Sequence, residues 1–245
     1  MTQRIRDLTS DELKLFAETI ALLERLDGTC NIRKKIFPNI VKLARADFAA
    51  SYVWDPGAGR FNGGLVHNMG KENIRHYEEW HQFHDPHTFE LRARRMATRI
   101  EEVTPYPMLY KTEFYTDFLR RDGLDHGINI FLFDGDRDLG DFRLWRAKSS
   151  AAFGEREVHL LNIMAPFIER AIVRSEKRAF VLTGRERQVA ELVARGCRDT
   201  DIARLLKIGF ATVRTHLNNA MEKNRWANRA ELAAAIGQSM SRSIS

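Results

Sequence analysis

The chain of 245 residues contains only two cysteines, Cys30 and Cys197, which lie far apart in the sequence. Two such thiols do not make the disulfide framework of a small secreted domain, and they are typical of a reduced, cytosolic protein. No stretch approaches the roughly 18 apolar residues that a membrane-spanning helix needs, and the N-terminus is too charged for a secretory signal. The sequence therefore predicts a cytoplasmic protein without membrane attachment.

Signatures of catalysis are also missing from the sequence. It contains no nucleophile elbow and no glycine loop that would cradle a phosphate. It also lacks the five-fold βα repeat that builds a phosphorylated receiver domain. We therefore expect neither an enzyme nor a bound cofactor.

Two runs of residues resemble metal sites. His81, His84 and His87 recur at three-residue spacing, but Pro86 would interrupt the helix that aligns them. The second run consists of Asp134, Asp136 and Asp138. A calcium loop needs a glycine where Leu139 stands, so a hairpin turn explains this run better. We predict no metal site.

The chain does contain enough apolar residues, 44% of the total, for one ordinary core and a small second domain. Its net charge of +6 is unevenly spread, because residues 180–245 hold 11 Lys and Arg against 6 Asp and Glu. Such a basic segment is typical of a domain that binds nucleic acid.

Residues 182–232 contain four short amphipathic segments with helix start and stop signals between them. Thr183 and Glu186 form a capping box, which predicts a first helix that ends near Gly196. The turn at residues 207–209 is too short for anything except a tight corner between two helices. The sequence thus predicts a third helix from residue 210 and, from the repeated capping spacing N-x-x-E at 228–231, a fourth.

The third predicted helix has two different faces. Val213, Leu217 and Met221 share one face and are expected to be buried. The opposite face carries side chains that can donate to phosphates or reach base edges, namely Thr212, Arg214, Thr215, His216 and Asn218. This pattern predicts a helix-turn-helix unit that reads DNA, with a plain four-helix scaffold as the alternative.

The segment resembles the C-terminal domain of LuxR-type transcriptional regulators. The resemblance is carried by LT-x-RE at 182–186, by I-x-x-x-TV-R-x-HL at 208–217 and by NR-x-E at 228–231. It implies that bases are faced by Arg214, Thr215 and Asn218. It implies that the DNA backbone is held by Thr212, His216, Lys223 and Arg229.

Some positions depart from the family pattern. The family usually has Ser where Arg198 stands, so Asp199 or Thr200 is expected to cap the second helix instead. Asn224 and Trp226 stand where the family usually has Leu and Val, which changes packing or dimer contacts at the end of the third helix.

The larger N-terminal part has the pattern of a mixed α/β domain. Amphipathic helices are predicted at about 10–26 and 32–46. Strand-like runs flank turn signals at 56–57 and at 134–135, which predicts two β-hairpins. Helical or loop segments at 71–123 are expected to cross one face of the resulting sheet.

This order of elements is similar to that of GAF or PAS-like ligand-sensing domains, with residues 153–172 as the closing helix. That helix is apolar over a wide arc, so we expect it to pack on its own sheet and against a partner subunit. Pro166 is expected to kink it or to split it in two.

Residues 76–89 concentrate aromatic side chains and histidines beside Asp85 and form the best pocket candidate. They resemble the aromatic and Asp-Pro elements of acyl-homoserine-lactone receptors, although Trp80 and Asp85 stand closer together here. The candidate walls are Tyr52, Trp54, Tyr77, Trp80, Phe83, Phe114, Tyr115, Phe131 and Trp145, and the candidate polar groups are His84, Asp85 and Asn129. Roughly half of them are expected to be ordinary core residues.

Taken together, the sequence predicts an α+β chain: an αβα sensor domain with a central antiparallel sheet at 1–174, a linker at 175–181 and a small all-α four-helix helix-turn-helix domain at 182–245. The predicted function is a homodimeric transcriptional regulator whose N-terminal domain binds a small-molecule effector and so controls binding to double-stranded operator DNA. Two alternatives stay open, an acyl-homoserine-lactone receptor for quorum sensing and a ligand-independent regulator controlled by a protein partner.

Overall fold

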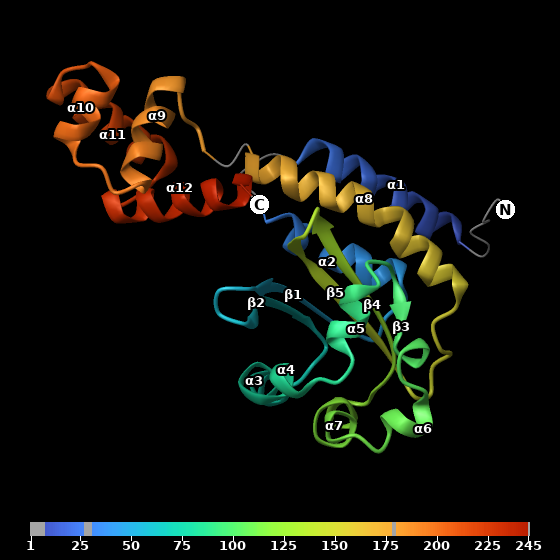
Figure 1. Ribbon diagram of the computed structural model, residues 1–245. Helices are drawn as coiled ribbons and strands as arrows, with labels where there is room; N and C mark the ends of the chain where they lie inside the picture. The colour runs from blue at the N-terminus through green and yellow to red at the C-terminus, as the bar shows by residue number, and fades with distance from the viewer. Residues whose placement is uncertain (1–7, 27–30, 178–179, 245) are drawn as a thin grey trace. The chain divides into compact units, whose positions relative to one another are not determined.

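The computed structural model describes residues 8–26, 31–177 and 180–244, so Cys30 lies outside the described residues. The described residues form two compact units, the first ending at Val173 and the second beginning at Arg174. Figure 1 shows that the first unit combines a sheet with helices and that the second is helical. The predicted α+β fold class is confirmed.

A five-stranded antiparallel sheet with the strand order β2-β1-β5-β4-β3 forms the centre of the first unit. Its strands are β1 (Phe48–Asp55), β2 (Arg60–His67), β3 (Thr98–Arg99), β4 (Leu124–Asp134) and β5 (Arg137–Ala147). Both predicted hairpins are present, since β1 pairs with β2 and β4 pairs with β5. Gly135 has a φ of 62° in the second hairpin, a value that favours glycine, so the nearby aspartates do form a turn.

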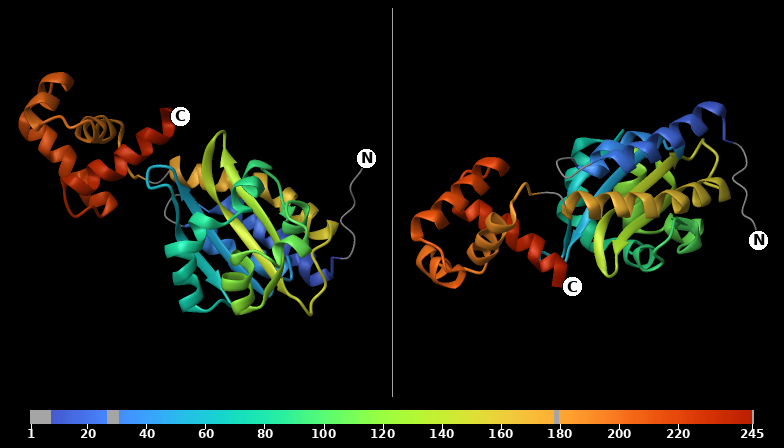
Figure 2. Two further views of the ribbon diagram at one scale, coloured as in Figure 1. Left: turned by 60° about the horizontal axis from the view of Figure 1, so that its bottom comes forward. Right: turned by 90° about the horizontal axis from the view of Figure 1, so that it is seen from above.

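Three helices cover one face of the sheet (Figures 1 and 2): α1 (Ser10–Arg25), α2 (Ile32–Leu43) and α8 (Glu155–Lys177). Successive strand residues point to opposite faces, so each strand contributes to two cores. Ile128, Ile130 and Leu144 pack under the helices, whereas Phe131 and Trp145 pack on the other face. The sheet is therefore buried on both sides, as the predicted αβα layering requires.

The other face is crossed by the segment between β2 and β4, as predicted (Figure 2). Besides β3, this segment contains short helical turns: α3 (Lys71–His76), η1 (Tyr77–His81), α4 (Gln82–His84), α5 (Thr88–Ala93), η2 (Ile100–Glu102), α6 (Tyr106–Leu109), η3 (Phe114–Leu119) and α7 (Arg120–Asp122). Two of them, η1 and η3, are π-helical, a rare form that is frequent at functional sites. They meet through Tyr77 and Phe118, whose ring centroids lie 5.1 Å apart.

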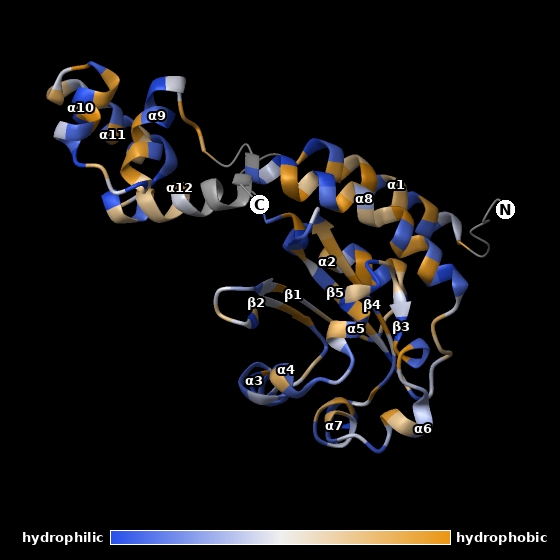
Figure 3. Ribbon diagram, viewed as in Figure 1, coloured by the Kyte–Doolittle hydropathy of each residue, from blue (hydrophilic) through white to orange (hydrophobic). Residues whose placement is uncertain are grey.

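Helix α8 is continuous, so the prediction that Pro166 splits it is wrong. Pro166 is exposed, and the buried side chains of Leu161, Met164 and Ile168 anchor the helix before and after it. This packing holds the helix together despite one missing backbone hydrogen bond. Figure 3 shows hydrophobic residues along much of α8, and Ile163 among them is 41% exposed.

A network of ion pairs joins α1, the end of α2 and α8. The carboxylate of Glu12 accepts from Arg45 at 2.6 and 2.8 Å and from Arg156 at 2.8 Å. The hydrogen bond from Arg45 is the main cause that lowers the pKa of Glu12 to about 2. Arg45 has a φ of 52°, which a right-handed helix does not accommodate, so α2 ends at Leu43 and not at residue 46.

Replacing Glu12 by glutamine is expected to lower the free energy of unfolding at pH 7 by about 1–2 kcal/mol, after allowance for solvent screening. The folded-state pKa of Glu12 lies below its ordinary value of 4.5, so the stabilisation is present above pH 4.5 and is lost as the pH falls towards 2. Urea unfolding of the wild type and of Glu12→Gln at pH 7 and at pH 3 measures this. A difference that stays the same at both pH values would contradict the prediction.

The second unit consists of four helices, α9 (Gly184–Ala194), α10 (Asp199–Leu206), α11 (Phe210–Asn224) and α12 (Arg229–Ile244). The predicted capping box is present, because the Thr183 and Glu186 side chains each accept from the other's backbone N–H. Asn228 caps α12 by accepting from the N–H of Glu231 at 3.0 Å. The helices enclose a small core, which includes Val189, Val193, Ile202, Val213, Leu217, Leu232 and Ile236.

The predicted cap of α10 is wrong. Neither Asp199 nor Thr200 occupies the N-cap position, which belongs to Arg198. The side chain of Asp201 accepts a hydrogen bond from the Arg198 N–H at 3.4 Å. This is one of the two hydrogen bonds of a capping box, and it takes the place of the usual serine cap. Asp199 pairs instead with Arg229.

The two residues that depart from the family pattern at the end of α11, Asn224 and Trp226, contact the segment that precedes α9. Asn224 accepts from the N–H of Val181 at 2.8 Å and donates to its carbonyl at 3.3 Å. The Trp226 ring packs on Phe180 with a centroid distance of 5.1 Å. The segment that leads into the helical unit is therefore held against the end of α11.

Candidate functional site

Helix α11 has one buried face and one exposed face. Val213 and Leu217 are buried, while Met221 is half-buried. Arg214, Thr215 and Asn218 are exposed and lie on the opposite face, since residues three and four apart share a helix face. The preceding turn at residues 207–209 sets α11 against α10, which gives the two-helix corner of a helix-turn-helix motif.

The four remaining residues assigned to DNA contacts differ in their surroundings. Thr212 is exposed near the start of α11, and His216 is half-buried. Lys223 donates to the buried carboxylate of Glu186 at 2.7 Å. Arg229 donates to the Cys197 carbonyl at 2.7 Å and pairs with Asp199. Lys223 and Arg229 therefore join helices within the unit, whatever else they contact.

Replacing Lys223 by glutamine is expected to destabilise the second unit by about 1 kcal/mol, because the buried carboxylate of Glu186 loses a charged donor. Burial raises the pKa of Glu186, but the hydrogen bonds from Lys223 and Thr183 outweigh it and lower the pKa overall. Chemical unfolding of fragment 180–245, monitored through Trp226, measures the change. An unfolding midpoint equal to that of the wild type would contradict the prediction.

A cavity lies between the sheet and the crossing segment in the first unit. The space between its wall atoms is about 380 Å³, part of which is open to solvent. They are formed by Ala50, Tyr52, Met69, Ile74, Tyr77, Asp85, His87, Thr88, Leu91, Ile100, Phe114, Phe118, Asn129, Arg143 and Trp145. Both π-helical turns contribute aromatic side chains to these walls.

Half of the predicted pocket residues lie around this cavity: Tyr52, Tyr77, Asp85, Phe114, Asn129 and Trp145. The other half lie elsewhere: Trp54, Trp80, Phe83, His84, Tyr115 and Phe131. The two groups cannot be told apart by residue type, because both are rich in aromatic side chains.

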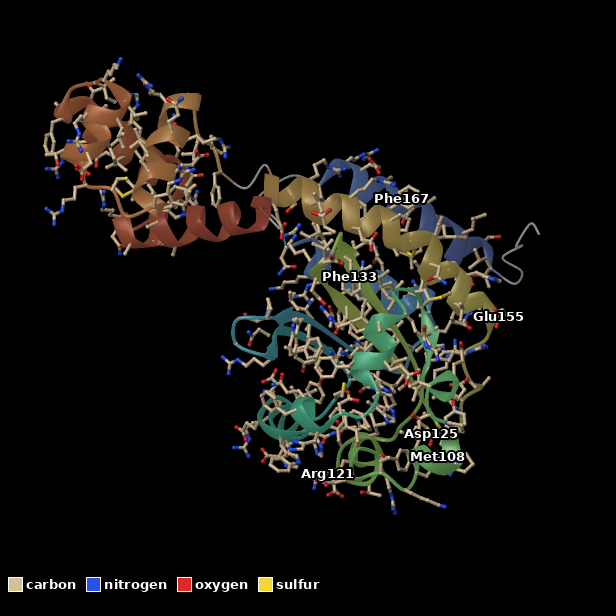
Figure 4. All side chains as sticks on the ribbon, in the orientation of Figure 1. Met108, Arg121, Asp125, Phe133, Glu155 and Phe167 are labelled. Atoms are coloured by element: carbon tan, nitrogen blue, oxygen red, sulfur yellow. The ribbon has the colours of Figure 1, made fainter. Side chains whose placement is uncertain are left out.

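The residues outside the cavity have other contacts. Trp80 is 45% exposed and stacks on His84, with ring centroids 4.0 Å apart, and Phe83 is also exposed. Tyr115 donates to Asp125 at 3.0 Å, at the site labelled Asp125 in Figure 4. The rings of Trp54 and Phe131 pack in the core on the cavity side of the sheet.

Arg143 on β5 is the main cavity residue that the sequence did not predict. It is 2% exposed, and its Nε and Nη2 lie 2.8 and 2.7 Å from the carboxylate of Asp141. Burial lowers the pKa of the guanidinium, but Asp141 raises it above its ordinary value, so Arg143 stays charged. The signal in the sequence was a pair of charged residues two positions apart, D-x-R, between apolar residues of the strand.

His87 and Thr88 were also missed as wall residues. Asp85 accepts from the backbone N–H groups of His87 and Thr88 at 2.8 and 3.1 Å, which fixes the first turn of α5. Burial lowers the pKa of His87, so its imidazole is neutral at pH 7. This turn places His87 and Thr88 on the cavity wall, and the only sign of the turn in the sequence is the Asp-Pro pair at 85–86.

Within the ranges that the structure describes, no three His, Cys, Asp or Glu side chains gather closely enough to hold a metal ion. In the same ranges no helix is long and apolar enough to cross a membrane.

The second unit matches a known family. Residues 180–236 match the bacterial regulatory proteins of the luxR family. The monoamine regulon transcriptional regulator of Klebsiella aerogenes is 26% identical over 174 residues, which cover 69% of this chain and 75% of that protein. The nitrate/nitrite response regulator protein NarL of Escherichia coli (strain K12) is 30% identical over 104 residues, which cover 42% of this chain and 48% of NarL. These relatives are transcriptional regulators and not enzymes.

Solved structures share the fold. SdiA of Escherichia coli has a TM-score of 0.55 at 15% identity, covering 93% of this chain and 98% of SdiA. The GAF domain of a phosphoenolpyruvate-protein phosphotransferase from Coxiella burnetii has a TM-score of 0.51 at 12% identity, covering 68% of this chain and 95% of that domain. The predicted similarity of the first unit to GAF domains is thereby confirmed as a similarity of fold.

Proposed function

Because the chain carries the helix-turn-helix domain of the luxR-family transcriptional regulators, we propose that it is a regulator whose first unit binds a small molecule and controls binding of a dimer to operator DNA. The observation that carries the proposal is the combination of an exposed polar face on α11 with a separate cavity in the first unit. As a DNA-binding regulator, the protein would act in the cytoplasm.

The proposed contact with DNA is made by α11. Arg214, Thr215 and Asn218 have the donor and acceptor groups that read base edges in a major groove. Thr212 and His216 flank this face and would contact phosphates. The N–H groups of Lys223 and Arg229 that are not used within the unit would contact phosphates as well. The net positive charge of residues 180–245 favours the approach of this unit to DNA.

The proposed effector site is the cavity of the first unit. Its walls are mostly aromatic and apolar with a few polar groups, which is the usual composition of a site for a small ligand. SdiA, which shares the fold, has been crystallised in complex with octanoyl-rac-glycerol, and the Klebsiella aerogenes relative regulates a monoamine regulon. Neither name fixes the ligand of this chain.

The proposed dimer has two-fold symmetry. Exposed Ile163 and half-buried Phe167 extend the apolar arc of α8 beyond the part that covers the sheet, which supports packing against a second copy. A two-fold dimer would recognise an inverted repeat with half-sites about one DNA turn, or roughly 10 base pairs, apart.

Selection of bound fragments from a genomic DNA library with the purified full-length protein tests the proposal. Enrichment of fragments that share an inverted repeat is expected, together with a dimeric mass in sedimentation equilibrium. Enrichment of no common sequence, in a protein shown by circular dichroism to be folded, would contradict the DNA-binding role. A monomeric mass on the operator would contradict the dimer alone.

A further inference from the structure

Five buried polar atoms on the cavity wall have no hydrogen-bond partner among the described residues. One of them, Arg143 Nη2, lies 2.7 Å from the Asp141 carboxylate in an ion pair. The other four are uncharged: the Tyr52 hydroxyl, His87 Nε2, Asn129 Oδ1 and Trp145 Nε1. Each of these side chains is at most 3% exposed. Buried polar groups in folded proteins are nearly always paired, so four such groups around one cavity point to a molecule that binds there.

Two of these groups lie close together on the cavity face of the sheet. Asn129 is opposite Arg143 in the pairing of β4 with β5, and Trp145 is opposite Gly127, one row away on the same face. A Cβ atom at Gly127 would lie 2.3 Å from Ile100 Cδ1 and 3.0 Å from Trp145 Nε1, so the glycine lets the Ile100 side chain and the indole pack against the strand. The Trp145 indole and the Asn129 carboxamide thus lie on the same face of the sheet, and both belong to the cavity wall.

The carboxylate that the sequence suggested for holding a ligand is already engaged. Asp85 accepts from the N–H of His87, from the N–H of Thr88 and, at 2.5 Å, from the Thr88 hydroxyl. These three hydrogen bonds stabilise the start of α5. Asp85 thus has a structural role at this site, and the sheet residues supply the free polar groups.

The charged groups on the cavity wall are engaged before any ligand enters. Arg143 forms an ion pair with Asp141, and its Nη1–H donates to the Tyr77 hydroxyl. Asp85 accepts from the three donors named above. The groups left without any partner are uncharged, so a charged ligand would have to compete with the contacts that Arg143 and Asp85 already make.

We infer that the cavity takes an uncharged ligand that offers a hydrogen-bond acceptor to the Trp145 indole and a donor to the Asn129 carboxamide, with an apolar part that packs against the cluster of Tyr77, Phe114 and Phe118. A carboxamide on an aromatic ring has these features, whereas the matching carboxylate and amine do not. This inference rests on the proposed sensor function, because it names the class of molecule that the same cavity accepts.

A thermal-shift experiment on the full-length protein with matched probes tests the ligand class. The probes are phenylacetamide, phenylacetate and phenethylamine, together with benzamide, benzoate and benzylamine, which differ mainly in the charge of the polar group. The amides are expected to raise Tm by about 2–4 °C at concentrations well above Kd, while the acids and amines leave it unchanged. An equal or larger shift with an acid or an amine, or no shift with either amide, would overturn the inference.

Variants test the residues. Asn129→Leu and Trp145→Phe each remove one polar group while preserving most of the side-chain volume, and either change is expected to abolish the shift caused by the amide. Trp80→Phe is the matched control, because it removes an exposed indole N–H outside the cavity, and it is expected to keep the shift. Loss of the shift in Trp80→Phe, or its retention in both sheet variants, would overturn the assignment of the polar groups. If one sheet variant does not fold, the other decides.

The failure of this inference and the failure of the proposed function have different signatures. Binding of acids or amines in the cavity would contradict only the ligand class and would leave the first unit a sensor. Operator binding by the same preparation, measured without any probe, tests the regulatory role independently of the ligand.

Discussion

Replacing Arg143 by methionine is expected to lower the free energy of unfolding of the first unit by about 3–5 kcal/mol. Arg143 and Asp141 are both almost completely buried, and two nitrogens of the guanidinium lie within 2.8 Å of the carboxylate. The guanidinium also lies over the Phe61 ring, 4.3 Å from its centroid. Methionine fills much of the same volume but leaves the carboxylate of Asp141 without its ion-pair partner.

Urea unfolding followed by tryptophan fluorescence measures this effect, because three of the four tryptophans, Trp54, Trp80 and Trp145, lie in the first unit. The double variant Arg143→Met/Asp141→Asn is the control, since it removes both charges together. It is expected to recover a large part of the lost stability. A single variant that loses less than about 1 kcal/mol would show that the ion pair contributes little to the fold.

Replacing Arg214 by alanine is expected to weaken binding to the operator by about 1–3 kcal/mol, or about 5- to 150-fold, if its guanidinium forms a bidentate contact with a guanine. Arg214 is exposed on α11, with its guanidinium 6.0 Å from the Phe210 ring, so its removal leaves the core of the unit intact. Fluorescence anisotropy with a labelled operator measures the loss.

Arg187→Ala is the control for charge, because Arg187 is also exposed but lies on α9, outside the proposed reading helix. It is expected to weaken binding to the operator and to a scrambled duplex by the same small factor. Arg214→Ala is expected to weaken binding to the operator more than binding to the scrambled duplex. Equal losses on both duplexes would mean that Arg214 contacts phosphate and not a base.

Elements whose signals are local in the sequence were predicted well. The capping box at Thr183 and Glu186 satisfies backbone donors within one helical turn, so it specifies the start of α9 without help from the rest of the chain. Alternation of side chains in β4 and β5, with a glycine at the turn, specifies the second hairpin in the same way. The two hairpins and the four helices of the second unit followed from such signals.

Elements that depend on tertiary packing were predicted less well. Pro166 was expected to kink α8 or to split it in two, and the split is wrong, because buried contacts before and after Pro166 keep the helix continuous. The π-helical turns at Tyr77–His81 and Phe114–Leu119 have no periodicity that distinguishes them from α-helix or loop. The cap of α10 was assigned to the wrong residue, because Asp201 acts from inside the helix.

The candidate pocket shows the same limit. Tyr77 and Trp80 stand three residues apart in one aromatic segment, yet Tyr77 lines the cavity and Trp80 is exposed. Which of them faces inward depends on how η1 is placed over the sheet. Arg143 was missed although its ion-pair partner Asp141 is only two residues away on the same strand. The burial of this pair depends on the segment that crosses the sheet, which the sequence does not place.

The central claim is that the second unit recognises a DNA sequence, and a titration of the full-length protein with two duplexes tests it most directly. The duplexes are the fragment selected from the genomic library and a scrambled version of the same length and composition, each measured at two salt concentrations. The account predicts that the selected duplex binds about 1,000-fold tighter or more at physiological salt, and that both affinities fall as salt rises. Equal affinity for both duplexes at each salt concentration would contradict it.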